Sequence, residues 1–285
     1  MFAWLKRKTA SPDPDSRDAL AEALLRAGTE MPEIHSVSRR EGLSFDVRPA
    51  HDPDLEVRSN ADNLWLHWSQ ATPGERPAMV ARFAASWVEG TRGEAPDPAR
   101  FLLLLRHTGY TQVGQGAQAA WCLPQGGDLA VMLAEDLPNS VRMVTVSQVA
   151  ELGLDDAGVI ALCQGNWAKR KPRLRVEELA DDFLLLTIPD DPWLTGSAVP
   201  MGDVGAALAA RGLSEALLIY PARDQIFATP ADRPDAVPHL AAMFQPDLAH
   251  RQSDFIWRWS AADGFAPVLQ PDGEGGFAPM GGPDA

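Results

Sequence analysis

Two runs of β-forming residues separated by a short polar turn place the strongest constraint on how this chain folds. Residues 216–220 (Ala-Leu-Leu-Ile-Tyr) and 225–228 (Gln-Ile-Phe-Ala) flank a turn at 221–224 (Pro-Ala-Arg-Asp). Apolar runs on either side of a Pro-led polar turn are typical of two buried strands joined as a β-hairpin. The pattern therefore predicts a hairpin that holds Arg223 and Asp224 at a fixed place between two core strands.

Helical and strand patterns alternate irregularly through the rest of the chain. The clearest helical pattern lies at 80–88, where apolar residues recur at the spacing of one helix face. Other helices are expected near residues 20–27, 63–70, 155–168, 202–211 and 235–247. Strands are expected at residues 43–47, 101–105, 129–133, 141–146, 183–188, 216–220, 226–228 and 255–259. This mixture predicts an α+β fold with mixed, largely antiparallel sheets and interleaved helices.

Both ends of the chain have compositions that oppose folding. They are rich in Pro, Gly or Asp and lack the apolar side chains whose burial offsets the entropy cost of ordering. We therefore expect a disordered leader over residues 1–15 and a disordered tail over residues 269–285. The region 16–268 is expected to be an α+β globular region, which could consist of two lobes at 16–140 and 141–268.

Charge and composition exclude several classes of partner. The 285 residues carry 25 Lys and Arg against 39 Asp and Glu, a formal net charge of −14 at pH 7. This charge repels DNA and anionic bilayers at long range, so we expect no nucleic-acid partner. Apolar residues 2–5 precede basic residues 6–8, the reverse of a secretory signal, and no stretch approaches the roughly 18 apolar residues of a membrane span. We expect a soluble cytoplasmic protein without stable membrane association, in which Cys122 and Cys163 are reduced thiols.

The residue patterns of common catalytic and cofactor sites are incomplete in this sequence. Residues 114–119 (Gly-Gln-Gly-Ala-Gln-Ala) match the dinucleotide pattern GxGxxA but lack a strand directly before them and a long helix after them. No serine stands in a GxSxG elbow, the histidines are scattered singly, and no GxxxxGK phosphate loop occurs. The sequence therefore predicts no cofactor, no metal centre and no catalytic residue of these kinds.

Two charged clusters are candidates for a site. Asp190 and Asp191 follow the strand expected at 183–188, and paired carboxylates there could bind a divalent cation or divide acid and base roles. The same two residues also fit a solvated turn. The basic cluster at 169–175 (Lys-Arg-Lys-Pro-Arg-Leu-Arg) could receive an acidic partner, or it could complement the dipole at a helix end.

Asn166, Arg223 and Asp224 complete the set of candidates. Asn166 falls within the apolar stripe of the helix expected at 155–168, and an unpaired buried amide costs about 1–3 kcal/mol, so it must have partners. These partners could be a neighbouring loop backbone or a ligand. Arg223 and Asp224 could present a donor fork and a carboxylate to a ligand or partner, or they could only stabilise the turn.

Two short segments resemble motifs of the YtpQ-like family, a family of bacterial proteins of unknown function. Residues 218–228 look like its Pro-Ser-Arg-Asp segment, with Ala in place of the serine. Residues 163–167 (Cys-Gln-Gly-Asn-Trp) resemble its Ala-x-x-Asn-Leu helix end, with Cys and Trp in place of Ala and Leu. The resemblance spans about residues 16–268, implies an α+β fold and implies no reaction. It singles out three residues, Asn166, Arg223 and Asp224.

These observations favour a binding or interaction module without catalytic activity. Its surface near the 221–224 turn would meet an unknown protein or small-molecule partner. The alternative is a metal-dependent hydrolase or transferase in which carboxylates such as Asp190, Asp191 and Asp224 gather around a cation. The two interpretations differ in one structural consequence, because the alternative requires those carboxylates to converge in one pocket.

Overall fold

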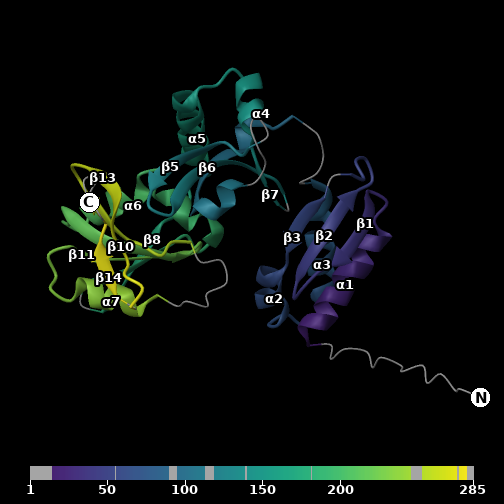
Figure 1. Ribbon diagram of the computed structural model, residues 1–285, viewed down its shortest axis with the longest axis horizontal. Coiled ribbons are helices and arrows are strands. Elements are labelled where there is room, and N and C mark those ends of the chain that lie inside the picture. Colours follow the sequence, from purple (N-terminus) through teal and green to yellow (C-terminus); the bar gives the residue numbers. More distant parts are fainter. Residues whose placement is uncertain are drawn as a thin grey trace, which may run out of the picture. The chain divides into compact units, whose positions relative to one another are not determined.

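The protein consists of two compact units (Figure 1). The computed structural model describes residues 15–54, 56–89, 95–112, 119–138, 140–180, 182–244, 252–274 and 276–280. Unit 1 comprises the chain up to Glu94 together with Leu137–Val141, and unit 2 comprises Ala95–Asp136 and Arg142–Ala285. The chain therefore first enters unit 2 near residue 95, whereas the lobes expected from the sequence met between residues 140 and 141.

Unit 1 is a three-stranded antiparallel sheet covered by helices. Its elements are α1 (Arg17–Glu30), β1 (Ile34–Arg39), β2 (Ser44–Pro49), β3 (Val57–Asn60), α2 (Asp62–Trp68) and α3 (Arg76–Glu89), with strand order β1-β2-β3. Ser16 caps α1 by accepting a hydrogen bond from the backbone N–H of Ala19 at 3.1 Å. Along β2 buried side chains alternate with half-buried ones, and Phe45 lies 5.7 Å from the ring of Trp87 on α3. The apolar face of the sheet and the helices thus share one core.

Unit 2 contains two antiparallel sheets among its described residues. The smaller has the order β4-β6-β5, with β7 paired to β6, and the larger has the order β14-β13-β12-β10-β11-β9-β8. The strands are β4 (Phe101–His107), β5 (Cys122–Gly126), β6 (Leu129–Asp136), β7 (Val141–Met143), β8 (Arg175–Ala180), β9 (Phe183–Thr187), β10 (Glu215–Ala222), β11 (Gln225–Pro230), β12 (Ile256–Ser260), β13 (Gly264–Pro271) and β14 (Phe277–Pro279). The strand pairs described in both units are antiparallel, so the predicted α+β fold is confirmed.

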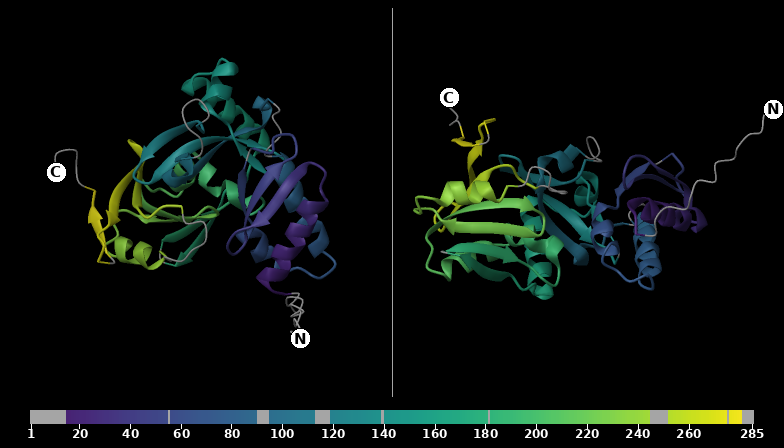
Figure 2. Two further views of the ribbon diagram at one scale, coloured as in Figure 1. Left: turned by 45° about the vertical axis from the view of Figure 1, so that its right-hand side comes forward. Right: turned by 90° about the horizontal axis from the view of Figure 1, so that it is seen from below.

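The helices of unit 2 cover different parts of these sheets. The helical elements are η1 (Pro98–Arg100), η2 (Thr108–Gln112), α4 (Val146–Glu151), α5 (Asp156–Arg170), η4 (Pro192–Ala198), α6 (Asp203–Ala209) and α7 (Ala236–Ala242). Helix α5 packs on β4, whereas α7 packs on β10 and β11. The views show these two helices on opposite sides of the unit (Figures 1 and 2). The seven-residue element η4 contacts β4, β9 and β11 and so joins the two sheets.

The predicted β-hairpin is present at the centre of the larger sheet. Leu218 pairs with Ala228 and Ile219 with Phe227, and β10 pairs with β12 on its other side. Strand β10 continues through Ala222, so the turn shortens to Arg223 and Asp224. The two charged residues therefore stand at the tip of two strands whose other residues are largely buried.

Two expectations about local structure require correction, and a third lies almost entirely outside the described residues. The strand expected at 141–146 ends at Met143, and α4 begins instead, because Thr145 and Gln148 form a reciprocal capping box. The tail expected to be disordered from residue 269 forms the end of β13 and β14, which gain backbone pairing and a contact of Phe277 with Phe244 at 5.2 Å. The leader at 1–15 lies outside the described residues except for Asp15, and residues 281–285 of the tail lie outside them also.

Two glycine substitutions test the packing described for the helices. A Cβ at Gly28 in α1 would stand 2.8 Å from Trp87 and 2.9 Å from Val37, so Gly28→Ala should destabilise the protein by about 1–3 kcal/mol. The Cβ of Gly165→Ala in α5 would meet no atom within 4 Å, so this change should stabilise by about 0.5–1 kcal/mol. Urea unfolding of the full chain measures both, and shifts of the same sign would contradict the packing.

Candidate functional site

Tyr220 anchors the β10–β11 hairpin to the interior of unit 2. Its side chain is buried, and its hydroxyl donates a hydrogen bond to the backbone carbonyl of Arg223 at 3.1 Å. Gly196 of η4 lies so close that any Cβ there would collide with this hydroxyl. Burial raises the pKa of Tyr220 to about 12, although the positive charges of Arg106 and Arg223 oppose the rise. The phenol therefore keeps its proton at neutral pH.

Arg106 brings a buried positive charge to the same place from β4. The residue is only 7% exposed. Its guanidinium donates to the backbone carbonyls of Leu105 at 2.8 Å and Trp193 at 3.4 Å. Among the described residues no carboxylate lies within ion-pair distance of it. Its buried charge is therefore balanced by neutral acceptors, an arrangement that costs several kcal/mol unless further groups compensate it.

Arg223 and Asp224 complete the charged surroundings of Tyr220. Both residues are half-buried at the hairpin turn, and their charges act on the Tyr220 hydroxyl together with the charge of Arg106. We call Arg106, Tyr220, Arg223 and Asp224 the hairpin cluster. With two guanidinium groups, one carboxylate and one neutral phenol, the cluster carries a net positive charge in a chain of net charge −14.

A second polar network fixes the backbone on which the hairpin cluster stands. The backbone N–H of Ser253 donates to the carbonyl of Tyr220 at 3.0 Å. Its hydroxyl donates to Asp128 at 2.7 Å and accepts from the indole of Trp257 at 2.8 Å. Burial raises the pKa of Asp128, and hydrogen bonds from Asp254 and Ser253 oppose this rise. The Ser253 hydroxyl is fully used and fully buried, so this serine is a structural group.

Asn166 binds backbone in the described structure. Its Nδ2 donates to the carbonyl of Pro98 at 2.8 Å and to that of Phe101 at 3.1 Å, and the residue is 7% exposed. The amide thus connects α5 to η1 and to the start of β4. This corresponds to the first of the two alternatives for Asn166, a backbone partner, and not to the second, a ligand. The same residue borders a cavity of about 320 Å³ with Arg100, Lys169 and others. A role for Asn166 in ligand binding stays a prediction.

The expected acidic candidates occupy separate surroundings. Asp191 forms an ion pair with Arg170 at 3.1 Å, and this guanidinium also pairs with Asp136. Asp190 is exposed, and Asp224 stands in the hairpin cluster. In the part of the chain that the structure describes, no three His, Cys, Asp or Glu side chains gather as metal ligands. Convergence of Asp190, Asp191 and Asp224 around a cation, which the metal-dependent alternative requires, is therefore not seen there.

The basic cluster at 169–175 spans the junction between α5 and β8. Lys171 ends α5 in the left-handed conformation at φ 50°, and Arg175 pairs with Glu177 at 3.1 Å. Arg170 is held by two acids and lies 5.7 Å from the ring of Trp193. The cluster is thus partly neutralised by its own neighbours. The expected GxGxxA stretch lies outside the described residues except for Ala119.

Sequence reasoning missed the groups that reach the hairpin cluster from other elements. Arg106, Asp128 and Ser253 are all buried and lie far from the hairpin in sequence. For Arg106 the sequence does offer one indication of a buried position, because this residue directly follows the apolar run Phe101–Leu105, which is buried throughout. A charged residue that continues such a run indicates an interior polar contact.

Comparison with known proteins adds no further constraint. No family model, curated protein or solved structure matches this chain. The resemblance to the YtpQ-like family therefore remains a prediction from the two short segments.

Within the described residues, the helices are too short or too polar to cross a membrane. Both cysteines are free, and burial raises the pKa of Cys163 to about 12.

Replacing Asn166 tests its structural interpretation. Asn166→Ala leaves the carbonyls of Pro98 and Phe101 without this donor, so the free energy of unfolding should fall by about 1–3 kcal/mol. Gln164→Ala, at an exposed position of the same helix, should change it by less than about 0.5 kcal/mol. Chemical denaturation measures both, and equal effects of the two changes would contradict the interpretation.

Alkaline titration tests the burial of Tyr220. The sequence has two tyrosines, so the phenolate absorbance of a Tyr110→Phe variant reports Tyr220 alone. Its midpoint should lie near pH 12 instead of pH 10. Because the folded-state pKa is raised, the stability contributed by the protonated phenol is complete below pH 10 and is lost as the pH rises toward 12. Tyr220→Phe should weaken this pH dependence of unfolding, and a midpoint near 10 would contradict the burial.

Proposed function

We propose that this chain is a binding protein without catalytic activity, which captures an anionic group at the hairpin cluster. The observation that supports this most is Arg106, a buried guanidinium with no carboxylate partner among the described residues. Arg223 adds a second guanidinium nearby, half-buried at a tip whose backbone is fixed by Tyr220 and Ser253. Guanidinium groups form strong, charge-assisted hydrogen bonds with carboxylate and phosphate oxygens. A bound oxyanion would supply the negative charge that the surroundings of Arg106 lack among the described residues.

The long-range charge of the protein restricts the size of this anion. A net charge of −14 repels extended polyanions, but salt screens this repulsion beyond about 8–10 Å. A compact carboxylate or phosphate can therefore approach the locally positive cluster, whereas a nucleic acid would meet the negative remainder of the surface. We accordingly propose a small molecule or a short acidic segment of a protein as the ligand.

The other polar groups of the region support recognition over proton transfer. At neutral pH the Tyr220 phenol keeps its proton because burial raises its pKa to about 12, so it is not a base. The Ser253 hydroxyl donates to Asp128 and accepts from Trp257, which leaves it poorly suited to attack a substrate.

We also propose a cytoplasmic location, supported by the free cysteines, and membership of the YtpQ-like family, supported by the two resembling segments.

Calorimetric titration with phosphate, citrate and tetraglutamate at one ionic strength tests the proposal. At least one of these anions should bind saturably to the full chain. Arg223→Ala should weaken that binding about 10- to 100-fold, because it removes a charge-assisted hydrogen bond. Asp224→Asn should strengthen binding several-fold by removing the negative charge of the cluster. The anion that responds separates a small-molecule ligand from an acidic peptide.

Two matched variants control this experiment. Arg258→Ala removes an exposed arginine from β12, and Asp232→Asn removes an exposed carboxylate after β11. Both should leave binding within about twofold, because neither belongs to the hairpin cluster. The proposal fails if none of the three anions binds better than chloride, or if Arg223→Ala and Arg258→Ala have the same effect.

A further inference from the structure

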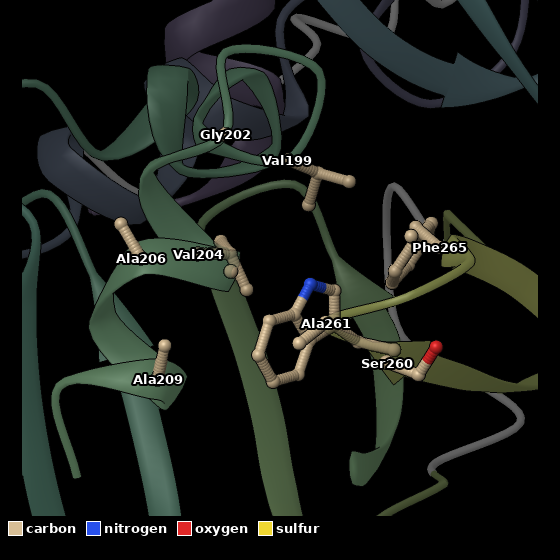
Figure 3. A pocket seen from close by; sticks show the side chains of 11 residues that line it. Val199, Gly202, Val204, Ala206, Ala209, Ser260, Ala261 and Phe265 are labelled. Carbon is tan, nitrogen blue, oxygen red and sulfur yellow. The ribbon is translucent and has the colours of Figure 1, made fainter. Parts of the chain in front are cut away.

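A second site lies in unit 2, beside helix α6. A pocket of about 410 Å³ opens between α6 and the β12–β13 hairpin (Figure 3). Figure 3 shows Val204, Ala206 and Ala209 on the helix side, and Ser260 and Phe265 on the strand side. None of the hairpin-cluster residues lines it. Its volume falls within the range of about 300–1,000 Å³ that is usual for small-molecule sites.

Small residues of α6 create the open space. Gly205 packs against the indole of Trp259, because a Cβ there would stand 2.6 Å from Nε1. Ala206 and Ala209, one and four positions further on, line the pocket with exposed methyl groups. Any larger side chain at these positions would fill the pocket or displace the indole. Because these α6 residues are small, the indole of Trp259 forms one wall of the pocket.

The indole N–H of Trp259 supplies a polar group at this wall. The residue is 9% exposed, and its Nε1 has no acceptor among the described residues. Four other indoles do have side-chain acceptors at 2.7–3.0 Å, in the pairs Trp87–Ser59, Trp121–Asp156, Trp167–Asp203 and Trp257–Ser253, whereas Nε1 of the buried Trp68 has none among the described residues. Unlike Nε1 of Trp68, Nε1 of Trp259 is open to solvent at the pocket, so this donor is available to an acceptor on a bound molecule.

The other polar side chain that lines the pocket, Ser260, already makes hydrogen bonds within the protein. The Ser260 hydroxyl donates to Asp263 at 3.1 Å and accepts from the backbone N–H of Asp263 at 2.8 Å. The other lining side chains are apolar or absent. A ligand would therefore find apolar walls and one available hydrogen-bond donor, which suits a molecule of low polarity with a single acceptor.

We propose that this pocket binds a small, largely apolar molecule, which accepts a hydrogen bond from Nε1 of Trp259. The proposal is independent of anion capture at the hairpin cluster, since it rests on different residues and the opposite ligand chemistry. Quinoline is a suitable probe because it is small and largely apolar and carries one acceptor nitrogen. Naphthalene has the same shape without the acceptor and serves as its matched control.

Nuclear magnetic resonance of the ¹⁵N-labelled full chain tests the hydrogen bond directly. The indole resonance that is missing in Trp259→Phe identifies Nε1–H of Trp259. Quinoline should move this resonance downfield and saturably, and naphthalene should not move it downfield. In calorimetry, Trp259→Phe should weaken quinoline binding about tenfold while changing naphthalene binding by less than about threefold. If quinoline moves no indole resonance, or moves the one from Trp259 no differently from naphthalene, the proposal is overturned.

Two leucine substitutions, one on α6 and one at the residue that caps its C-terminus, test the location of the site. Ala206→Leu puts a large side chain into the pocket, whereas Ala210→Leu adds the same side chain at an exposed position that does not line it. Leucine is a good helix former, so both variants should fold. Ala206→Leu should weaken quinoline binding at least about tenfold, and Ala210→Leu should leave it within about twofold. Equal effects of the two substitutions would overturn the site.

Discussion

The close contact between the Tyr220 hydroxyl and Gly196 is the constraint on which the functional part of unit 2 depends. Only a residue without a side chain lets η4 approach the phenol, and that approach buries the hydroxyl beside Arg106. The hydroxyl then fixes the carbonyl of Arg223, so the hairpin tip and the buried guanidinium belong to one packed assembly. A flexible tip would lose binding energy to the entropy of ordering, whereas this one is already ordered.

Elements with strong local patterns could be predicted from the sequence, and elements made by pairing could not. The hairpin and the amphipathic helix α5 follow from periodicity and turn chemistry, which act within a few residues. Strands β8 and β14 lie at the two edges of the larger sheet; β8 is rich in charged residues, and β14 is three residues long and follows a Gly-rich segment. Their strand structure arises from hydrogen bonding to a neighbour, which no local pattern records. Thr145 and Gln148 show the opposite case. Their spacing is that of a capping box and can be recognised in the sequence, but they stand at the end of a run of β-forming residues that predicted a strand instead.

The candidate site was predictable only in part, for a related reason. Arg223 and Asp224 stand in a turn that the sequence defines, and the helical spacing of Asn166 correctly implies a buried amide. The partners of these groups come from distant parts of the chain, as the 125-residue separation of Asp128 and Ser253 illustrates. Tertiary convergence of this kind leaves no local trace. A single buried arginine after five apolar residues was the one signal, and its meaning depends on which carbonyls surround it.

The two tryptophans of β12 show that the presence or absence of a hydrogen-bond acceptor, more than the residue type, distinguishes a structural group from a binding group. Trp257 and Trp259 are two residues apart and so point to the same face of the strand. The indole of Trp257 donates to Ser253 and has no remaining polar capacity, so it supports the network below the hairpin. The indole of Trp259 borders an apolar pocket with its donor unused among the described residues. The same side chain therefore closes the interior at one position and offers a contact at the other, because only the second lacks an acceptor.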